Sequence, residues 1–196
     1  MAERDQEFFI EIIVIHVENR LFKIPQHVLT TNSPVFRNMF DMPIPKDSKP
    51  DGCSEEQPLV LEGIKASEFA RLLRCIYPLN FRDRSFQLEF SLEEWEEVLK
   101  LATFYEMSEV KAFVVEEMAP LFGSDMAVQQ VQLSQVYGVT SWLELGLHEL
   151  VQRAEPLTAL DIDAIGSIHA AEVMSLREYL PSKSQAAKDN PDLWWS

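Results

Sequence analysis

Along this chain the apolar residues change from the dense runs of β-strands to the spacing of helices, and that change limits the folds it can adopt. Residues 8–17 are dense in Phe, Ile and Val, and a turn-prone Glu18-Asn19-Arg20 separates them from a second apolar run at 21–24. Two such runs around a short turn predict a β-hairpin. From residue 25 onward the apolar residues recur mainly at helical spacing, with one more short strand predicted at 59–61. We therefore expect an α+β protein with a small sheet and many helices.

Two short helices are predicted directly after the hairpin. Pro25 is suited to open the first of them, because a proline at the start of a helix loses no hydrogen bond. The second has Ser33 as its N-cap and Pro34 at its first position, followed by apolar residues on one face up to residue 40. Residues 42–58 are polar and contain several prolines, so we expect an unpacked surface loop there. A helix ending near Pro78 follows the strand at 59–61.

The second half of the sequence predicts helices only. Ser91 with Glu94, and Ser141 with Glu144, have the spacing of capping boxes at helix starts. Phe113 is expected to face inward, and a boundary is predicted near residue 123. The last two helices are placed at 158–165 and 168–180, and a polar tail at 181–196 ends in Trp194-Trp195.

The charge of the chain limits its partners. It carries 17 Lys and Arg against 32 Asp and Glu, a formal charge of −15. Nucleic acid and anionic membranes should therefore be repelled, and we expect protein partners with basic faces. Cys53 and Cys75 lie in no metal or redox motif, which favours a reducing compartment. With no signal sequence or membrane-spanning segment in the sequence, we predict a cytoplasmic or nuclear protein.

Motifs for catalysis are not found in the sequence. Its four histidines lie in separate predicted elements without metal-ligand spacing, and phosphate-binding and nucleophile motifs are missing. We expect no catalytic residue, cofactor, metal or small-molecule substrate. The acidic cluster at residues 93–97 is interpreted as a solvated helix start. A group of basic residues near Phe81 and Phe86 is interpreted as salt-bridged or partner-facing, and it comprises Arg71, Arg74, Arg82 and Arg84.

Three blocks of residues, in order, resemble the signature of the BTB/POZ domain family over residues 8–119. The residues that carry the resemblance are Leu29, Ser33, Phe36, Met39, Phe40, Phe69, Leu72, Leu73, Tyr77, Ala102 and Tyr105. The following helical stretch, 124–180, is similar to the helical extension of a group of fungal BTB proteins. The resemblance implies a small sheet flanked by helical hairpins, and surfaces that bind proteins without catalysis.

Several functions fit this resemblance. The first is an adaptor, for which a cullin-type ubiquitin-ligase scaffold is one candidate partner. Homo-oligomerisation or a transcription-regulatory role is the alternative. Because only seven residues precede the predicted first strand, dimerisation by exchange of an N-terminal segment is not expected. Asp41, Met42 and Ile44 are the candidate protein-binding residues, since apolar residues flanked by prolines lose little entropy on binding; a partner-free insertion is the competing interpretation. The Trp194-Trp195 end is either a docking tail or a free anchor.

Overall fold

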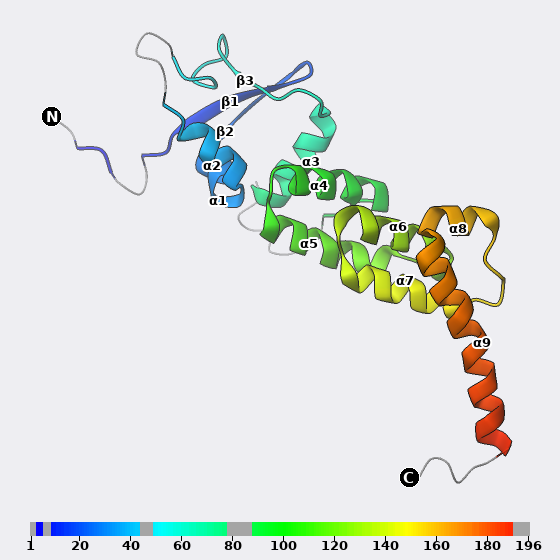
Figure 1. Ribbon diagram of the computed structural model, residues 1–196. Helices are drawn as coiled ribbons and strands as arrows, with labels where there is room; N and C mark the ends of the chain where they lie inside the picture. Colours follow the sequence, from blue (N-terminus) through cyan, green and yellow to red (C-terminus); the bar gives the residue numbers. More distant parts are fainter. Residues whose placement is uncertain (1–2, 6–8, 44–48, 78–87, 190–196) are drawn as a thin grey trace. The chain divides into compact units, whose positions relative to one another are not determined.

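The fold is described from a computed structural model, which covers residues 3–5, 9–43, 49–77 and 88–189 (Figure 1). Side chains are described up to residue 179. The chain divides into two compact units, residues 1–118 and 119–196. The first unit holds a small sheet with helices and the second is helical, as the α+β prediction required.

A three-stranded sheet of order β2-β1-β3 begins the first unit. Strand β1 (Ile12–Val17) pairs antiparallel with β2 (Arg20–Pro25) and parallel with β3 (Leu59–Val60). The predicted first strand was therefore too long at its start. Ile12 lies opposite Pro25, and one more hydrogen bond, of 2.9 Å from the N–H of Gln26 to the carbonyl of Glu11, follows this pair before the two segments separate.

The turn between β1 and β2 also caps a helix. Glu18 has a positive φ of 52°, an uncommon conformation for a residue with a side chain. One oxygen of its carboxylate accepts a hydrogen bond of 2.8 Å from the backbone N–H of Ala66. Ala66 is the first residue of α3 (Ala66–Ile76), so the hairpin turn satisfies one of the free donors at the start of this helix.

The predicted pair of short helices is present, with one correction. Helix α1 (His27–Asn32) is preceded by Gln26, and Pro25 ends β2 rather than opening the helix. Helix α2 (Pro34–Phe40) begins as predicted, with Ser33 as N-cap and Pro34 at its first position.

Part of the segment predicted as an unpacked loop packs against the sheet. Gly52 is buried, and its carbonyl accepts a 2.9 Å hydrogen bond from the N–H of Val14. A Cβ at Gly52 would lie 2.5 Å from Cγ1 of Ile13, and φ is +84° there, so only glycine suits this approach. The segment thus covers the edge of β1 beyond the short β3. Residues 44–48 lie outside the described residues.

Helices α4 (Leu92–Phe104) and α5 (Ser108–Met118) complete the first unit. The capping box of Ser91 and Glu94 is confirmed. Arg71 of α3 forms ion pairs with Glu94 at 2.6 Å and Glu97 at 2.5 Å, so the acidic cluster is partly paired rather than only solvated. Phe113, predicted to face inward, is 40% exposed.

The second unit contains helices α6 (Ala127–Tyr137), α7 (Thr140–Gln152), α8 (Ala159–Ile165) and α9 (Ser167–Asp189). Two 3-10 turns, η1 (Ala119–Leu121) and η2 (Ser124–Met126), precede them. Its core consists of the buried residues Ala127, Val131, Leu150, Ile165, Ala170 and Val173.

Two predictions for this unit were wrong. Ser141 does not cap α7, because the helix already begins at Thr140 with Val139 at the N-cap and no side-chain hydrogen bond. Gly138, in the left-handed conformation, ends α6 directly before Val139, so the N-cap position of α7 falls on an apolar residue that cannot form a side-chain cap. Helix α9 also continues beyond residue 180 to Asp189, through a stretch that contains the good helix formers 185–188.

The start of α8 provides a pH-dependent prediction. One oxygen of the Asp161 carboxylate accepts hydrogen bonds from the N–H of Thr158 at 2.9 Å and from Arg153 at 2.7 Å, and these contacts lower the pKa of Asp161 below its usual 3.8. The resulting stabilisation is complete above pH 3.8 and is lost as the pH falls through the lower folded-state pKa. Asp161→Asn should therefore destabilise the chain at neutral pH and have little effect once the carboxyl is protonated. Denaturation across this pH range tests it.

The control for this prediction is Asp163→Asn, an exposed position on the same helix. It removes the same charge without the same contacts, so its effect at neutral pH should be small. An Asp161→Asn effect that is equal at both ends of the pH range would contradict the prediction.

Candidate protein-binding surface

The hairpin of α1 and α2 is anchored to the end of α4 by a buried serine. The Ser33 hydroxyl donates a 2.6 Å hydrogen bond to the carbonyl of Tyr105 and accepts one of 3.2 Å from the N–H of Phe36. The ring of Phe36 stacks on Tyr105 with centroids 4.6 Å apart. Burial raises the pKa of Tyr105 to about 12, so its phenol stays protonated at neutral pH. These contacts fix the hairpin rather than create a reactive site.

The residues that carry the family resemblance lie mainly in this core. Seven of them besides Ser33 are fully or nearly fully buried: Leu29, Phe36, Phe69, Leu72, Leu73, Ala102 and Tyr105. Met39, Phe40 and Tyr77 are half-buried. The pattern is therefore a packing pattern, and it does not by itself mark a binding surface.

Two neighbouring hollows lie beside α1 and α2. One, of about 450 Å³, is lined by Gln26, Thr30, Thr31, Arg37, Phe40 and Asp41. The other, of about 300 Å³, is lined by Phe9, Ile10, Glu11, Gln26, His27 and Thr30. They share Gln26 and Thr30. Arg37 donates from Nε and Nη2 to the carbonyl of Thr30 at 3.2 and 2.9 Å, which ties the two helices together.

Exposed apolar side chains surround these hollows. Phe9 is 56% exposed and Met42 65%, and Ile10 is also exposed. Apolar groups beside polar rims are typical of protein-binding surfaces. We call the residues of the two hollows together with Met42 the α1–α2 surface. Of the three residues singled out from the sequence, Asp41 and Met42 are exposed on it, and Ile44 lies outside the described residues.

Phe9 and Ile10 were not recognised as surface residues from the sequence. They belong to the apolar run that predicts the first strand, and nothing in that run shows where strand pairing stops. The hairpin register is the signal that could have placed them beyond the strand, because Ile12 lies opposite the last residue of β2.

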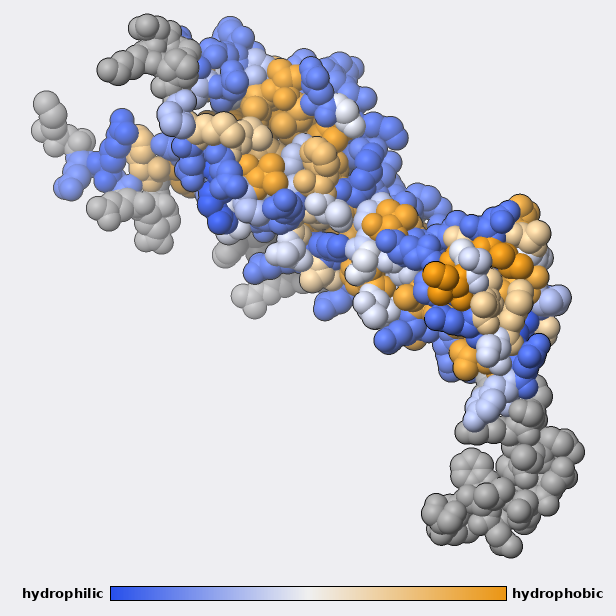
Figure 2. All heavy atoms as spheres, in the orientation of Figure 1, coloured by the Kyte–Doolittle hydropathy of each residue, from blue (hydrophilic) through white to orange (hydrophobic). Residues whose placement is uncertain are grey.

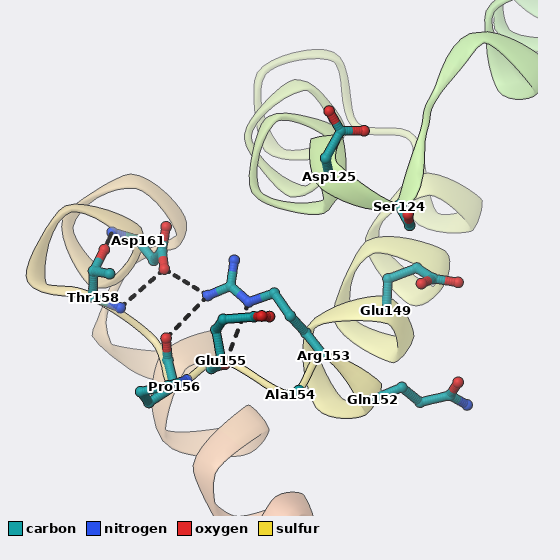
Figure 3. Close-up of a pocket in the computed structure, with 10 residues that line it drawn as sticks. All are labelled: Ser124, Asp125, Glu149, Gln152, Arg153, Ala154, Glu155, Pro156, Thr158 and Asp161. Carbon is teal, nitrogen blue, oxygen red and sulfur yellow. Dashed lines mark hydrogen bonds and ion pairs between the residues drawn. The ribbon is translucent and has the colours of Figure 1, made fainter.

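A larger hollow, of about 660 Å³, lies in the second unit (Figure 3). Among the described residues that line it, Arg153 is the one cation, and its guanidinium donates to the carbonyl of Pro156 at 3.2 Å and to Asp161 at 2.7 Å. Glu149 and Gln152 point away from this ion pair in the close-up. The arginine therefore ties the α7–α8 connection together.

The cysteines and the potential metal ligands fit the same picture. Cys53 and Cys75 are free thiols, and burial raises the pKa of Cys75 to about 12, so it is no nucleophile at neutral pH. Over residues 3–5, 9–43, 49–77 and 88–179, His, Cys, Asp and Glu form no group of three that could hold a metal ion. In the part of the chain that the structure describes, no helix is both long and apolar enough to span a bilayer.

Comparison with the sequence patterns of known protein families identifies the family of this chain. The sequence pattern of the BTB/POZ domain matches residues 2–119, which is more than half of the chain. No significant match is found among curated proteins. The matched residues contain the sheet, the anchored α1–α2 hairpin and helices α3 to α5. Together with this fold, the match shows that the chain belongs to the BTB/POZ domain family.

Proposed function

We propose that this chain is a non-catalytic adaptor whose α1–α2 surface binds one protein, while the helical unit or the tail presents a second surface. The family consists of protein-interaction modules. The observation that carries the proposal is the exposure of Phe9, Ile10 and Met42 around the two hollows beside α1 and α2. The hydrogen bond of Ser33 anchors these two helices to the end of α4. A rigid surface with exposed apolar groups loses little entropy when it binds.

The proposal divides the chain into an interaction domain at 8–119, a helical extension at 124–180 and a tail at 181–196. The separation into two compact units near residue 118 supports the first boundary. The helical extension has its own buried core, which supports a second, independently folded surface. A cytoplasmic or nuclear location is part of the same proposal.

A cullin-type scaffold is one candidate for the first partner. The resemblance to the family suggests it, and the exposed residues after α2 give it a place to bind. A pull-down with the purified N-terminal region of a cullin tests it directly. No binding at tens of micromolar would remove this candidate while leaving the adaptor proposal in place.

Self-association is the alternative function. The net charge of −15 opposes it at low ionic strength, because two copies repel each other. Light scattering over a concentration series separates the two functions. A chain that stays monomeric at high concentration excludes homo-oligomerisation as its role.

We expect Met42→Asp to weaken capture of the first partner roughly fivefold or more, since a charge would replace an exposed apolar side chain at the surface. The measurement is quantitative affinity capture of the intact chain from its own cells, followed by mass spectrometry. Ile44→Asp is tested in parallel.

Phe104→Asp is the matched control, because Phe104 is 69% exposed in the same unit and lines neither hollow. It should leave the recovered proteins unchanged. If neither Met42→Asp nor Ile44→Asp alters the recovered set, the α1–α2 surface is not the binding surface.

A further inference from the structure

Helix α9 has two apolar sides, of which its own unit covers only one. Ala170 and Val173 are buried in the core. Ile168 is 72% exposed on the side of the helix opposite these two residues, and Leu176, 49% exposed, lies between the two sides. Tyr179 follows within one turn and is 53% exposed. A surface helix normally has a single apolar stripe toward its core, so the second stripe calls for a ligand.

A hollow beside this stripe extends it toward α7. It has a volume of about 490 Å³ and is lined by Leu147, Ala171, Glu172, Val173, Ser175 and Leu176. Leu176 belongs to both the hollow and the exposed stripe, so the two form one continuous surface. We call it the α7–α9 surface. Figure 2 shows apolar residues gathered on the visible face of this unit.

Carboxylates border the α7–α9 surface. Glu172 lines the hollow, and Glu144 lies one turn before Leu147 on α7. Nδ1 of His169 lies 3.1 Å from a carboxylate oxygen of Glu172, one turn before it on α9. The surface therefore combines apolar side chains with negative charge.

The arginines of this unit do not neutralise that charge. Between residues 119 and 179 the chain has eight carboxylates, Asp125, Glu144, Glu149, Glu155, Asp161, Asp163, Glu172 and Glu178, against two basic residues, Arg153 and Arg177. Arg177 donates to the carbonyls of Leu150 at 2.9 Å and Arg153 at 2.8 Å, at the end of α7. Arg153 pairs with Asp161. Both cations are thus used within the fold.

We propose that the α7–α9 surface binds an amphipathic helix of a partner protein, with an apolar face flanked by Lys or Arg. A groove between two helices accepts apolar side chains at the spacing of a third helix. The carboxylates at its border favour basic flanks on that helix. A second copy of this chain would instead bring carboxylates against carboxylates. The inference rests on the adaptor function, for which it supplies the second surface.

The test uses the intact chain and a designed peptide. The peptide is about 14 residues long, Ala-based and helical, with leucines along one face and lysines on both flanks. A matched peptide has glutamate at each lysine position. Titration into the isotope-labelled chain should shift amide signals of α7 and α9. We expect the lysine peptide to bind in the range of about 10–100 µM and the glutamate peptide at least about tenfold more weakly.

Variants of the chain assign the binding to this surface. Ile168→Ser should weaken the lysine peptide about fivefold or more, and Glu172→Lys should shift the preference toward the glutamate peptide. Leu160→Ser is the control, because Leu160 is 80% exposed on α8 and lines no part of the hollow. Circular dichroism establishes that each variant keeps its helices.

Three results would overturn the proposal. They are equal binding of both peptides, unshifted α7 and α9 signals, or an equal loss with Leu160→Ser. Self-association of the free chain that Ile168→Ser abolishes would assign the surface to a second copy and also overturn it. None of these outcomes depends on the partner of the α1–α2 surface, so this inference and the effect of Met42→Asp fail separately.

Discussion

Replacing Phe36 by alanine is expected to lower the free energy of unfolding of the first unit by about 3–5 kcal/mol. Phe36 is fully buried, and its ring packs between Tyr105 and Phe40 with centroid distances of 4.6 and 6.3 Å. Alanine would remove most of that apolar contact and leave a cavity that helices fixed at both ends cannot close. Native-state hydrogen exchange of peptides from α1, α2 and α4 measures the change within this unit.

Phe104→Ala is the matched control, because Phe104 carries the same side chain with 69% of it exposed. Its effect should stay within about 0.5 kcal/mol. A loss below about 1 kcal/mol for Phe36→Ala would contradict the interpretation of this hairpin as rigidly anchored. Met42→Asp, in contrast, should reduce binding without reducing stability, since Met42 is exposed.

Local signals in the sequence predicted local structure well. The N-cap at Ser33 with Pro34 behind it and the capping box at Ser91 both occur as predicted. Each depends on contacts within four residues, so the sequence around it is sufficient. The BTB/POZ fold was recognised because several such signals follow one another in a fixed order.

Features that depend on distant residues were not predictable in the same way. The start of β1 is set by where β2 ends on the opposite side of the hairpin, and Gly52 packs on Ile13 and bonds to Val14 from a segment whose sequence is that of a polar loop. The Ser141 cap failed because the end of the preceding helix decides where α7 begins. Contacts with residues far along the chain decide the first two cases, and the end of the neighbouring helix decides the third.

The candidate binding surface was predictable only in part. Met42 is exposed as its polar, proline-rich surroundings predicted. Phe9 and Ile10 were missed, because an exposed apolar residue and a strand residue have the same appearance in a sequence. The outward stripe of α9 was missed for a related reason: apolar periodicity shows that a face is apolar but not whether anything covers it.

Gly146 marks the closest approach between α6 and α7, and substitution there is expected to have the other large effect. Gly146 is buried within α7, and a Cβ built on it would lie 2.7 Å from Cγ2 of Val131 and 3.0 Å from the carbonyl oxygen of Ala127. The valine side chain can rotate away, but the carbonyl belongs to the backbone of α6. The two helices must therefore move apart to admit any side chain.

Two opposing effects decide the result for Gly146→Ala. Alanine favours a helix over glycine by about 1 kcal/mol, whereas overpacking a core costs about 1–3 kcal/mol. We expect a net loss of about 1 kcal/mol for Gly146→Ala. For Gly146→Val the loss should be about 3 kcal/mol, because two more methyl groups must be placed and a β-branched residue is a poorer helix former. Hydrogen exchange of peptides from α6 and α7 measures these changes locally.

Leu145→Val is the control that separates packing from helix propensity. Because Leu145 is 52% exposed on the same helix, this substitution changes mainly the helix propensity of the residue. That control should cost less than about 0.7 kcal/mol. From most to least stable, the expected order is then wild type, Gly146→Ala and Gly146→Val, because each larger side chain pushes α7 further from α6. If Gly146→Ala were instead more stable than the wild type, α6 and α7 could separate at little cost. In that case the surface that α7 forms with α9 would be adjustable rather than fixed, and its peptide affinity should differ between the two Gly146 variants.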